Sequence, residues 1–264
     1  MTAFVASATK TRLCLGIDPS AELLAEWKLP VSAAGAERFA DICIDASMGI
    51  LSTVKFQVAF FEQFGSAGFS ALERSLCRAT DLGLRVIADA KRSDIGSSMA
   101  GYARAWVAND SPFRAAAVTV SPFMGVEGLA EVAEIAAAAG RTVFVLVATS
   151  NPEGRSIQAG TGKSLAFQIL SAVNLLQEAH HSLGVVIGAN LNLREYGLQR
   201  IKAEALGFPI LAPGFGHQGA RLSTCSSHFG LSAEWVIPNV GRSVLTGNPE
   251  SLPDRLTSAL EELL

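Results

Sequence analysis

The chain contains eight short apolar runs with strand-like composition, and longer stretches separate them. The runs cover residues 12–18, 53–58, 84–90, 115–121, 142–150, 183–189, 208–214 and 234–240. In the stretches between them, such as residues 33–51, 125–139 and 165–179, apolar residues recur at helical spacing. Nearly continuous apolar runs are typical of parallel strands buried on both faces, and their alternation with helices indicates βαβ units.

Eight such units in 264 residues match the size of a (β/α)8 TIM barrel. A doubly wound open sheet is the alternative, and it would place a functional site at a topological switch point instead. The sequence has no linker, low-complexity segment or change of composition that would divide it. We therefore expect residues 1–264 to form one α/β domain, a (β/α)8 barrel.

Composition narrows the possible partners and the compartment. The 21 basic and 24 acidic residues give a net charge of −3 without a basic cluster, which argues against nucleic-acid binding. No run reaches about 18 apolar residues, and the N-terminus lacks the apolar core of a signal peptide, so we expect no membrane span. A reduced, cytoplasmic protein also fits the cysteines, which form no CxxC pair: Cys14, Cys43, Cys77 and Cys225.

Two glycine-rich segments match nucleotide-binding motifs in part. "GFGHQG" at 214–219 fits G-x-G-x-x-G, but it lies near the end of the chain rather than in an opening βα turn. "GTGKS" at 160–164 lacks the first glycine of a P-loop, and a helix beginning at Ser164 is the better interpretation. The four histidines show no metal-ligand spacing, so we expect neither a nucleotide cofactor nor a metal.

The most informative segment is "VIADAKRSDIGSS", residues 86–98, where an apolar strand ends among charged residues that include Asp89, Lys91 and Asp94. Alternation along a strand places Asp89 and Lys91 on the same face as Ile87, and Asp94 falls in the following turn. A salt-bridged strand end with a capping aspartate is the simpler explanation. It is weak for charges facing the inside of a barrel, because an unpaired buried charge costs several kcal/mol.

Lys55 interrupts another apolar run and can meet Asp89 from the neighbouring strand. We call Lys55, Asp89, Lys91 and Asp94 the charge array. Such an array suits a reaction that develops a carbanion without a cofactor, because a carboxylate repels a departing carboxylate group and an ammonium stabilises and protonates the remaining carbon.

The last two apolar runs are followed by "PGFGHQG" and "NVGRS". The loops after strands seven and eight of such barrels typically hold phosphate, and an arginine there offers two parallel hydrogen bonds. Two flexible turns and a surface arginine are the alternative. The sequence favours a phosphate site that includes Gln218, Gly219, Gly241 and Arg242.

Taken together, these motifs resemble those of the orotidine 5′-phosphate decarboxylase family, in its branch with longer, bacterial-type chains. The resemblance covers nearly the whole chain and is strongest at "DAKRSDIGSS", which fits the family pattern D-x-K-x-x-D-I. The other matching segments follow in order: "LCLGIDPS", "VKFQVAFFEQFG", "TSNPEGRSIQ", "APGFGHQG" and "NVGRSVL".

The resemblance implies a role for each residue in converting orotidine 5′-phosphate to UMP and CO2 without cofactor or metal. Lys91 would donate a proton to C6, Asp89 would face the substrate carboxylate, and Lys55 would hold the array together. Asp94, with Ile95 and Ser98 beside it, would reach into the partner's site across a homodimer interface. Asp18 would bind the ribose hydroxyls, and Ser121 would bind the pyrimidine edge. Gln218 and Arg242 would hold the phosphate.

Three other functions remain open at this point. Related aldose-phosphate decarboxylases and aldolases share a similar D-x-K-x-x-D but need metal ligands, so a chelator distinguishes them. A Schiff-base aldolase would use Lys91 or Lys55, and borohydride would trap its substrate adduct. A non-catalytic nucleotide-binding barrel would bind UMP without turnover.

Overall fold

The structure is a computed structural model that describes residues 12–160, 163–198 and 208–264. Within these residues, eight parallel strands form one closed barrel in chain order, and β1 pairs with both β2 and β8. The strands are β1 (Cys14–Ile17), β2 (Thr53–Gln57), β3 (Arg85–Arg92), β4 (Ala117–Val120), β5 (Thr142–Ala148), β6 (Leu183–Ile187), β7 (Ile210–Ala212) and β8 (Val236–Val240). The predicted (β/α)8 barrel is confirmed, and the open-sheet alternative is wrong.

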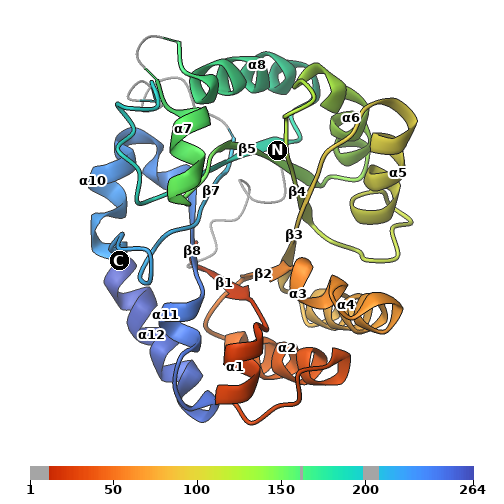
Figure 1. Cartoon of the computed structure of the whole chain (residues 1–264), viewed down its shortest axis with the longest axis vertical. Coiled ribbons are helices and arrows are strands. Elements are labelled where there is room, and N and C mark those ends of the chain that lie inside the picture. The colour runs from red at the N-terminus through yellow and green to blue at the C-terminus, as the bar shows by residue number, and fades with distance from the viewer. Residues whose placement is uncertain (1–11, 161–162, 199–207) are drawn as a thin grey trace.

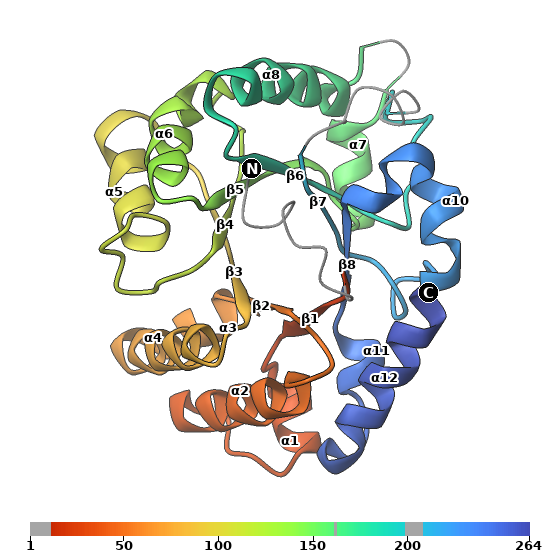
Figure 2. The same cartoon turned by 180° about the vertical axis from the view of Figure 1, so that it is seen from behind.

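Helices surround the barrel as an outer ring when it is viewed end on (Figures 1 and 2). The α-helices are α1 (Ala21–Glu26), α2 (Ala33–Ser47), α3 (Ala59–Glu62), α4 (Gly65–Asp81), α5 (Gly96–Trp106), α6 (Ala130–Ala138), α7 (Arg155–Gln158), α8 (Leu165–His180), α10 (Cys225–Phe229), α11 (Arg242–Leu245) and α12 (Leu252–Leu263). The short 3-10 helices are η1 (Glu127–Leu129), η2 (Pro152–Gly154), η3 (Leu222–Thr224), η4 (Gly230–Trp235) and η5 (Pro249–Ser251).

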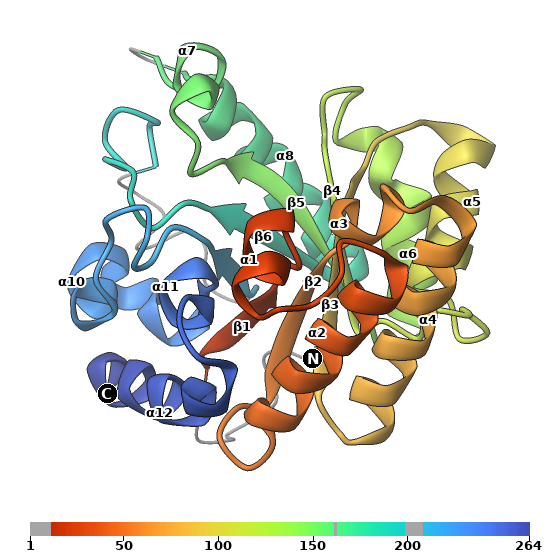
Figure 3. The same cartoon turned by 60° about the horizontal axis from the view of Figure 1, so that its bottom comes forward.

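Local sequence explains where the longer helices begin and what they bury. The Ser32 hydroxyl caps α2 by accepting a hydrogen bond from the Gly35 amide at 3.2 Å. Ser164 caps α8 in the same way, which confirms the helix start predicted there. The buried residues of α2 recur at helical spacing, and the helix packs beside α4 on the outside of the barrel (Figure 3): Ala36, Phe39, Ala40, Cys43 and Ile44.

The interior of the barrel has its own small core, separate from the core between the strands and the helices. It consists of Cys14, Ile87, Ala117, Phe144, Val186, Leu211 and Ile237. Phe144 fills much of this space, and a Cβ at Gly184 would lie 2.7 Å from the Phe144 ring. These side chains fill the interior of the barrel, and polar residues begin above them, at the carboxyl ends of the strands.

Candidate active site

A cavity of about 860 Å³ lies at the carboxyl ends of the strands, within the size range of small-molecule sites. Its polar lining comes from most strands of the barrel or from the loops that follow them. Those residues include Asp18, Lys55, Gln57, Asp89, Lys91, Thr119, Thr149, Ser150, Asn151, His217, Gln218, Asn239 and Arg242. The catalytic edge of a (β/α)8 barrel is the expected place for such a concentration of polar groups.

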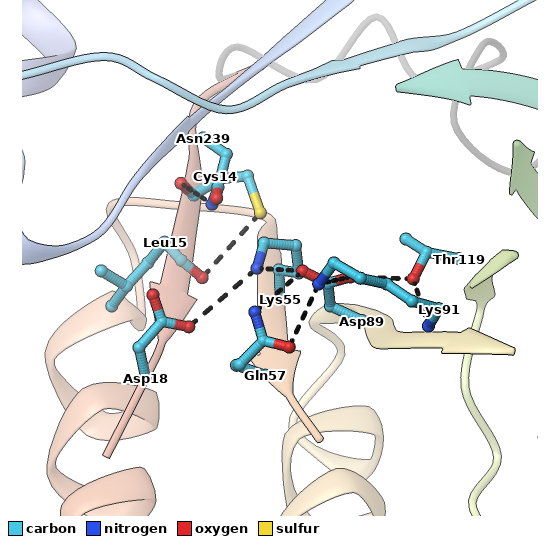
Figure 4. A network of polar contacts seen from close by, with 9 residues as sticks. All are labelled: Cys14, Leu15, Asp18, Lys55, Gln57, Asp89, Lys91, Thr119 and Asn239. Atoms are coloured by element: carbon cyan, nitrogen blue, oxygen red, sulfur yellow. Dashed lines mark hydrogen bonds and ion pairs between the residues drawn. The ribbon is translucent and has the colours of Figure 1, made fainter. Parts of the chain in front are cut away.

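Three members of the predicted charge array meet at the bottom of this cavity (Figure 4). The Asp89 carboxylate accepts hydrogen bonds from both lysines: Lys55 Nζ lies 2.9 Å from Oδ2, and Lys91 Nζ lies 2.8 Å from Oδ1. Lys55 Nζ also lies 4.0 Å from Asp18 Oδ1. The register of the sheet explains the meeting, because Gln57 on β2 pairs with Asp89 on β3 and Lys55 is two residues earlier on the same face.

The two lysines differ in exposure. The Lys55 side chain is 5% exposed and the Asp89 side chain 10% exposed, whereas the Lys91 side chain is 45% exposed. Both ammonium groups contact one carboxylate in the same cavity, but of the two side chains only that of Lys91 is substantially exposed. Lys55 is therefore placed to hold the array, and Lys91 is placed to reach a bound molecule.

The electrostatics keep Asp89 and Lys55 charged. Burial alone would raise the pKa of Asp89, but the Lys55 and Lys91 ammonium groups outweigh it and hold that pKa well below its usual range. Burial would likewise lower the pKa of Lys55, but the Asp89 and Asp18 carboxylates raise it above its usual value. In contrast, burial raises the pKa of the Asp18 carboxyl despite the nearby Lys55. The array thus places a fixed anion between two cations.

Two further residues complete the contacts around Asp89, and the sequence analysis missed both. Gln57 Nε2 donates to Asp89 Oδ2 at 3.3 Å, and Gln57 Oε1 accepts from Lys91 Nζ at 3.2 Å. Thr119 Oγ1 donates to Asp89 Oδ1 at 2.8 Å and accepts from the Lys91 backbone amide at 3.0 Å. The available signal was spacing, since Gln57 follows Lys55 by two residues and so shares its face of the strand.

Lys91 has a left-handed backbone, with φ of 46°. The pairing of β3 with β4 shifts between Ala88 and Arg92, so the strand is irregular at this point. A left-handed conformation costs a non-glycine residue about 1–2 kcal/mol, and such strain concentrates at functional sites. The irregularity turns the Lys91 side chain back onto Asp89, so simple alternation along the strand does not describe Lys91.

On the opposite side of the cavity, the loops after β7 and β8 contribute Gln218, Gly241 and Arg242. Gly241 lies so close to Asp18 that a Cβ there would be 3.1 Å from Asp18 Oδ2. Gly214 has φ of 110°, a conformation that favours glycine, and it allows the loop after β7 to turn over the cavity. Gly219, which the sequence placed in the same group, lines a second cavity of about 500 Å³ instead.

Five predicted site residues lie outside the lining of the cavity: Gly219, Asp94, Ile95, Ser98 and Ser121. Asp94 Oδ1 accepts a hydrogen bond from the Ile95 amide at 2.8 Å, in the segment between β3 and α5. Ser98 is exposed on α5. Ser121 follows β4, and its amide donates to the Arg92 carbonyl at 2.8 Å. Near the end of β5, the polar residues in the lining are Thr149, Ser150 and Asn151.

Within the described residues, no group of three or more His, Cys, Asp or Glu side chains is placed to hold a metal ion. In the same part of the chain, no helix is long and apolar enough to cross a membrane. Cys14 lies in the interior core below the array, where burial raises its pKa to about 12. That thiol is therefore protonated at neutral pH and is a poor nucleophile.

Comparison with known proteins identifies relatives across almost the whole chain. The curated orotidine 5′-phosphate decarboxylase of Corynebacterium glutamicum (strain R) is 44% identical over 254 residues, which are 93% of this chain and 89% of the relative. The enzyme of the same name from Corynebacterium efficiens is 43% identical over the same length. These identities extend well beyond the site itself.

Solved structures agree with the sequence relatives. A Streptomyces avermitilis protein assigned as an orotidine 5′-phosphate decarboxylase superposes with a TM-score of 0.86 at 39% identity, covering 96% of this chain and 90% of its own. Leishmania donovani OMP decarboxylase superposes with a TM-score of 0.77 at 26% identity, covering 97% and 95%. The sequence model of the orotidine 5′-phosphate decarboxylase / HUMPS family matches residues 11–250, and this chain therefore belongs to that family.

Proposed function

We propose that this protein is a carboxy-lyase of pyrimidine biosynthesis that converts orotidine 5′-phosphate to UMP and CO2. The 44% identity to a curated orotidine 5′-phosphate decarboxylase supports the reaction. The observation that carries the proposal is the contact of Lys55 and Lys91 with the two oxygens of one buried carboxylate, Asp89, at the bottom of a cavity. No cofactor or metal enters the proposed reaction.

In the proposed reaction, the substrate carboxylate on C6 lies against Asp89. The two negative charges repel each other, and this repulsion is relieved when the C6–carboxylate bond breaks and CO2 leaves. The bonding electron pair stays on C6, where the Lys91 ammonium stabilises it and then donates a proton to form UMP. The neutral Lys91 amine regains a proton from water, and Lys55 remains charged throughout.

The rest of the cavity suits the rest of a nucleotide. Arg242 and Gln218 offer donors to the 5′-phosphate, and Asp18 offers acceptors to the ribose hydroxyls. All three line the same cavity as Lys55, Asp89 and Lys91. The contact of Ser121 with the pyrimidine edge stays a prediction, as does the participation of Gly219 in the phosphate loop.

We also propose that the enzyme is a homodimer in which Asp94 and Ser98 enter the partner's site. Exposed apolar side chains beside Asp94 and in the loop between β4 and η1 support this proposal: Ile95 is 54% exposed, Phe123 88% and Met124 54%. Ile95 lies over η1, since its Cγ2 is 3.4 Å from where a Cβ at Gly128 would be. A second copy would cover this apolar surface and bring Asp94 with it. A cytoplasmic location stays a prediction from the sequence.

Turnover of orotidine 5′-phosphate, followed by ultraviolet absorbance with a chelator present, tests the reaction. We expect native turnover and a loss of about 100- to 10,000-fold in Lys91→Ala, the range typical of a lost general acid. A melting curve and UMP binding verify that the variant is folded. No native turnover with intact UMP binding would leave a nucleotide-binding barrel, and borohydride trapping of an adduct would favour a Schiff-base aldolase.

Mixing two inactive variants tests the dimer. Lys91→Ala and Asp94→Ala are purified separately, then unfolded and refolded together. If Asp94 acts across the interface, each hybrid dimer has one site with both residues intact, and random pairing restores about a quarter of the native sites. If Asp94 acts within its own chain, mixing restores nothing.

A further inference from the structure

Thr119 lies where the pairing between β3 and β4 is interrupted. Ala88 pairs with Val118, and Arg92 pairs with Val120, so Thr119 alone faces the three residues from Asp89 to Lys91. Its side chain bridges the interruption: Oγ1 accepts from the Lys91 amide at 3.0 Å and donates to Asp89 Oδ1 at 2.8 Å. Thr119 is 1% exposed, so water does not readily replace either bond.

A hydroxyl group has one proton and can accept further hydrogen bonds. The carboxylate of Asp89 can only accept and the amide of Lys91 can only donate, so the direction of both bonds is fixed. One oxygen atom therefore links the backbone of the proposed proton donor to the carboxylate that its side chain contacts. It also holds the left-handed backbone of Lys91, whose Nζ lies 2.8 Å from the same Asp89 oxygen.

We propose that Thr119 is a positioning residue for Asp89 and Lys91. This proposal rests on the proposed decarboxylation. The Thr119 hydroxyl sets the backbone of Lys91 and the orientation of the Asp89 carboxylate together, so that the ammonium and the carboxylate face a bound substrate in one fixed arrangement. Thr119 acts through these two residues and forms no bond to the reacting atoms. Positional errors of about 1 Å at a reacting group cost about 100-fold in rate, so the loss of a positioning residue should produce a measurable fall in kcat.

Thr119→Val tests the proposal, because valine keeps the shape of threonine and loses the hydroxyl. We expect kcat for orotidine 5′-phosphate to fall about 10- to 100-fold while KM changes less than about threefold, since the phosphate and ribose contacts are retained. Thr119→Ser keeps the hydroxyl and should retain kcat within about threefold of the native value.

Thr142→Val provides a matched control. Thr142 is also a fully buried strand threonine, but its hydroxyl is without a hydrogen-bond partner among the described residues. It should leave kcat unchanged, so an equal loss of kcat in Thr142→Val and Thr119→Val would indicate a general effect on packing and overturn the proposal. A Thr119→Val enzyme with native kcat, or a Thr119→Ser enzyme as impaired as Thr119→Val, would also overturn it.

Amide hydrogen exchange at Lys91, measured by NMR, gives a readout that does not depend on activity. The amide loses its acceptor in Thr119→Val and should exchange faster than in the native protein, whereas Thr119→Ser should keep its protection. If the native protein fails to decarboxylate the substrate, the proposed function fails, yet this comparison still tests the bridge. Unchanged exchange in Thr119→Val would overturn the bridge itself. Should Thr119→Val fail to fold, Thr119→Ala provides the same comparison of exchange.

Discussion

Lys55 and Asp89 form a buried ion pair, with Lys55 Nζ 2.9 Å from Asp89 Oδ2 and both side chains at most one-tenth exposed. Lys91 contacts the other oxygen of the same carboxylate at 2.8 Å but is 45% exposed. One carboxylate therefore has two cationic partners at nearly equal distance and very different burial. In the proposed reaction, this difference in burial assigns a stabilising role to Lys55 and a reactive role to Lys91.

The stability of the protein should depend on Lys55 much more than on Lys91. Lys55→Met leaves a buried carboxylate with one partner fewer, and we expect the free energy of unfolding to fall by about 3–5 kcal/mol. Lys91→Met removes a half-exposed partner of the same carboxylate and should cost about 1 kcal/mol or less. Urea denaturation of both variants at neutral pH measures the difference, and equal losses would contradict it.

The contribution of Asp89 to stability should disappear in acid. Its pKa is lower in the folded than in the unfolded protein, because the two lysines outweigh the effect of burial. The unfolded chain therefore takes up a proton that the folded protein does not bind, so stability falls as the pH drops below the ordinary aspartate pKa of about 4. Above that pH, the full contribution is present.

Asp89→Asn isolates this effect from the other carboxylates. We expect the native protein to have the larger free energy of unfolding at pH 7, and the gap to the variant to narrow progressively below about pH 4. Urea denaturation between pH 3 and pH 7, chosen to span the transition, measures the gap. Parallel curves for the two proteins would show that Asp89 titrates normally.

Arg242 should contribute to substrate binding through the phosphate. Charge-assisted hydrogen bonds contribute about 1.5–3 kcal/mol, so Arg242→Ala should lower kcat/KM for orotidine 5′-phosphate about 10- to 100-fold. Steady-state kinetics measures this loss, and the nucleoside without phosphate should show almost none of it. Arg221→Ala is the control, since Arg221 lines the second cavity and should leave kcat/KM unchanged.

Gly184 should tolerate no side chain. A Cβ there would lie 2.7 Å from the Phe144 ring and 2.8 Å from the Pro209 carbonyl oxygen, so Gly184→Ala should lower the free energy of unfolding by about 1–3 kcal/mol. Adding Phe144→Leu should recover part of this loss. Gly101→Ala in α5 meets no atom within 4 Å and should be neutral or stabilising, because alanine favours a helix. Urea denaturation of the three variants tests the comparison.

The eight apolar runs, their alternation with helical patterns and the chain length predicted the barrel, and each observed strand overlaps one of the runs. The helical patterns were less accurate at element ends: the helix expected over residues 33–51 ends at Ser47, and Gly49 has φ of 78°. The prediction that residues 1–264 form one domain stays a prediction, and it includes residues 1–11, 161–162 and 199–207, which lie outside the described residues.

The site was predictable where a charge interrupts an apolar strand, as at Lys55 and Asp89. Gln57 and Thr119 were missed because spacing can place a neutral polar residue on a face of a strand but does not identify its hydrogen-bond partners. The left-handed backbone of Lys91 could not be predicted from the sequence either, because the shift in pairing with β4 depends on a contact between distant parts of the chain. Alternation predicted the face of Asp89. Only the structure shows that the irregular strand brings Lys91 Nζ back to the Asp89 carboxylate.

The interior core around Phe144 fills the barrel on the side away from the charged residues. Among the described residues, the side chains of this core fill the space below the array, so the cavity opens on the other side. In the proposed reaction, the substrate therefore enters, and UMP and CO2 leave, at the carboxyl ends of the strands. In the proposed reaction, UMP must therefore leave the cavity before the next substrate molecule can bind. UMP that is retained there competes directly with the incoming substrate.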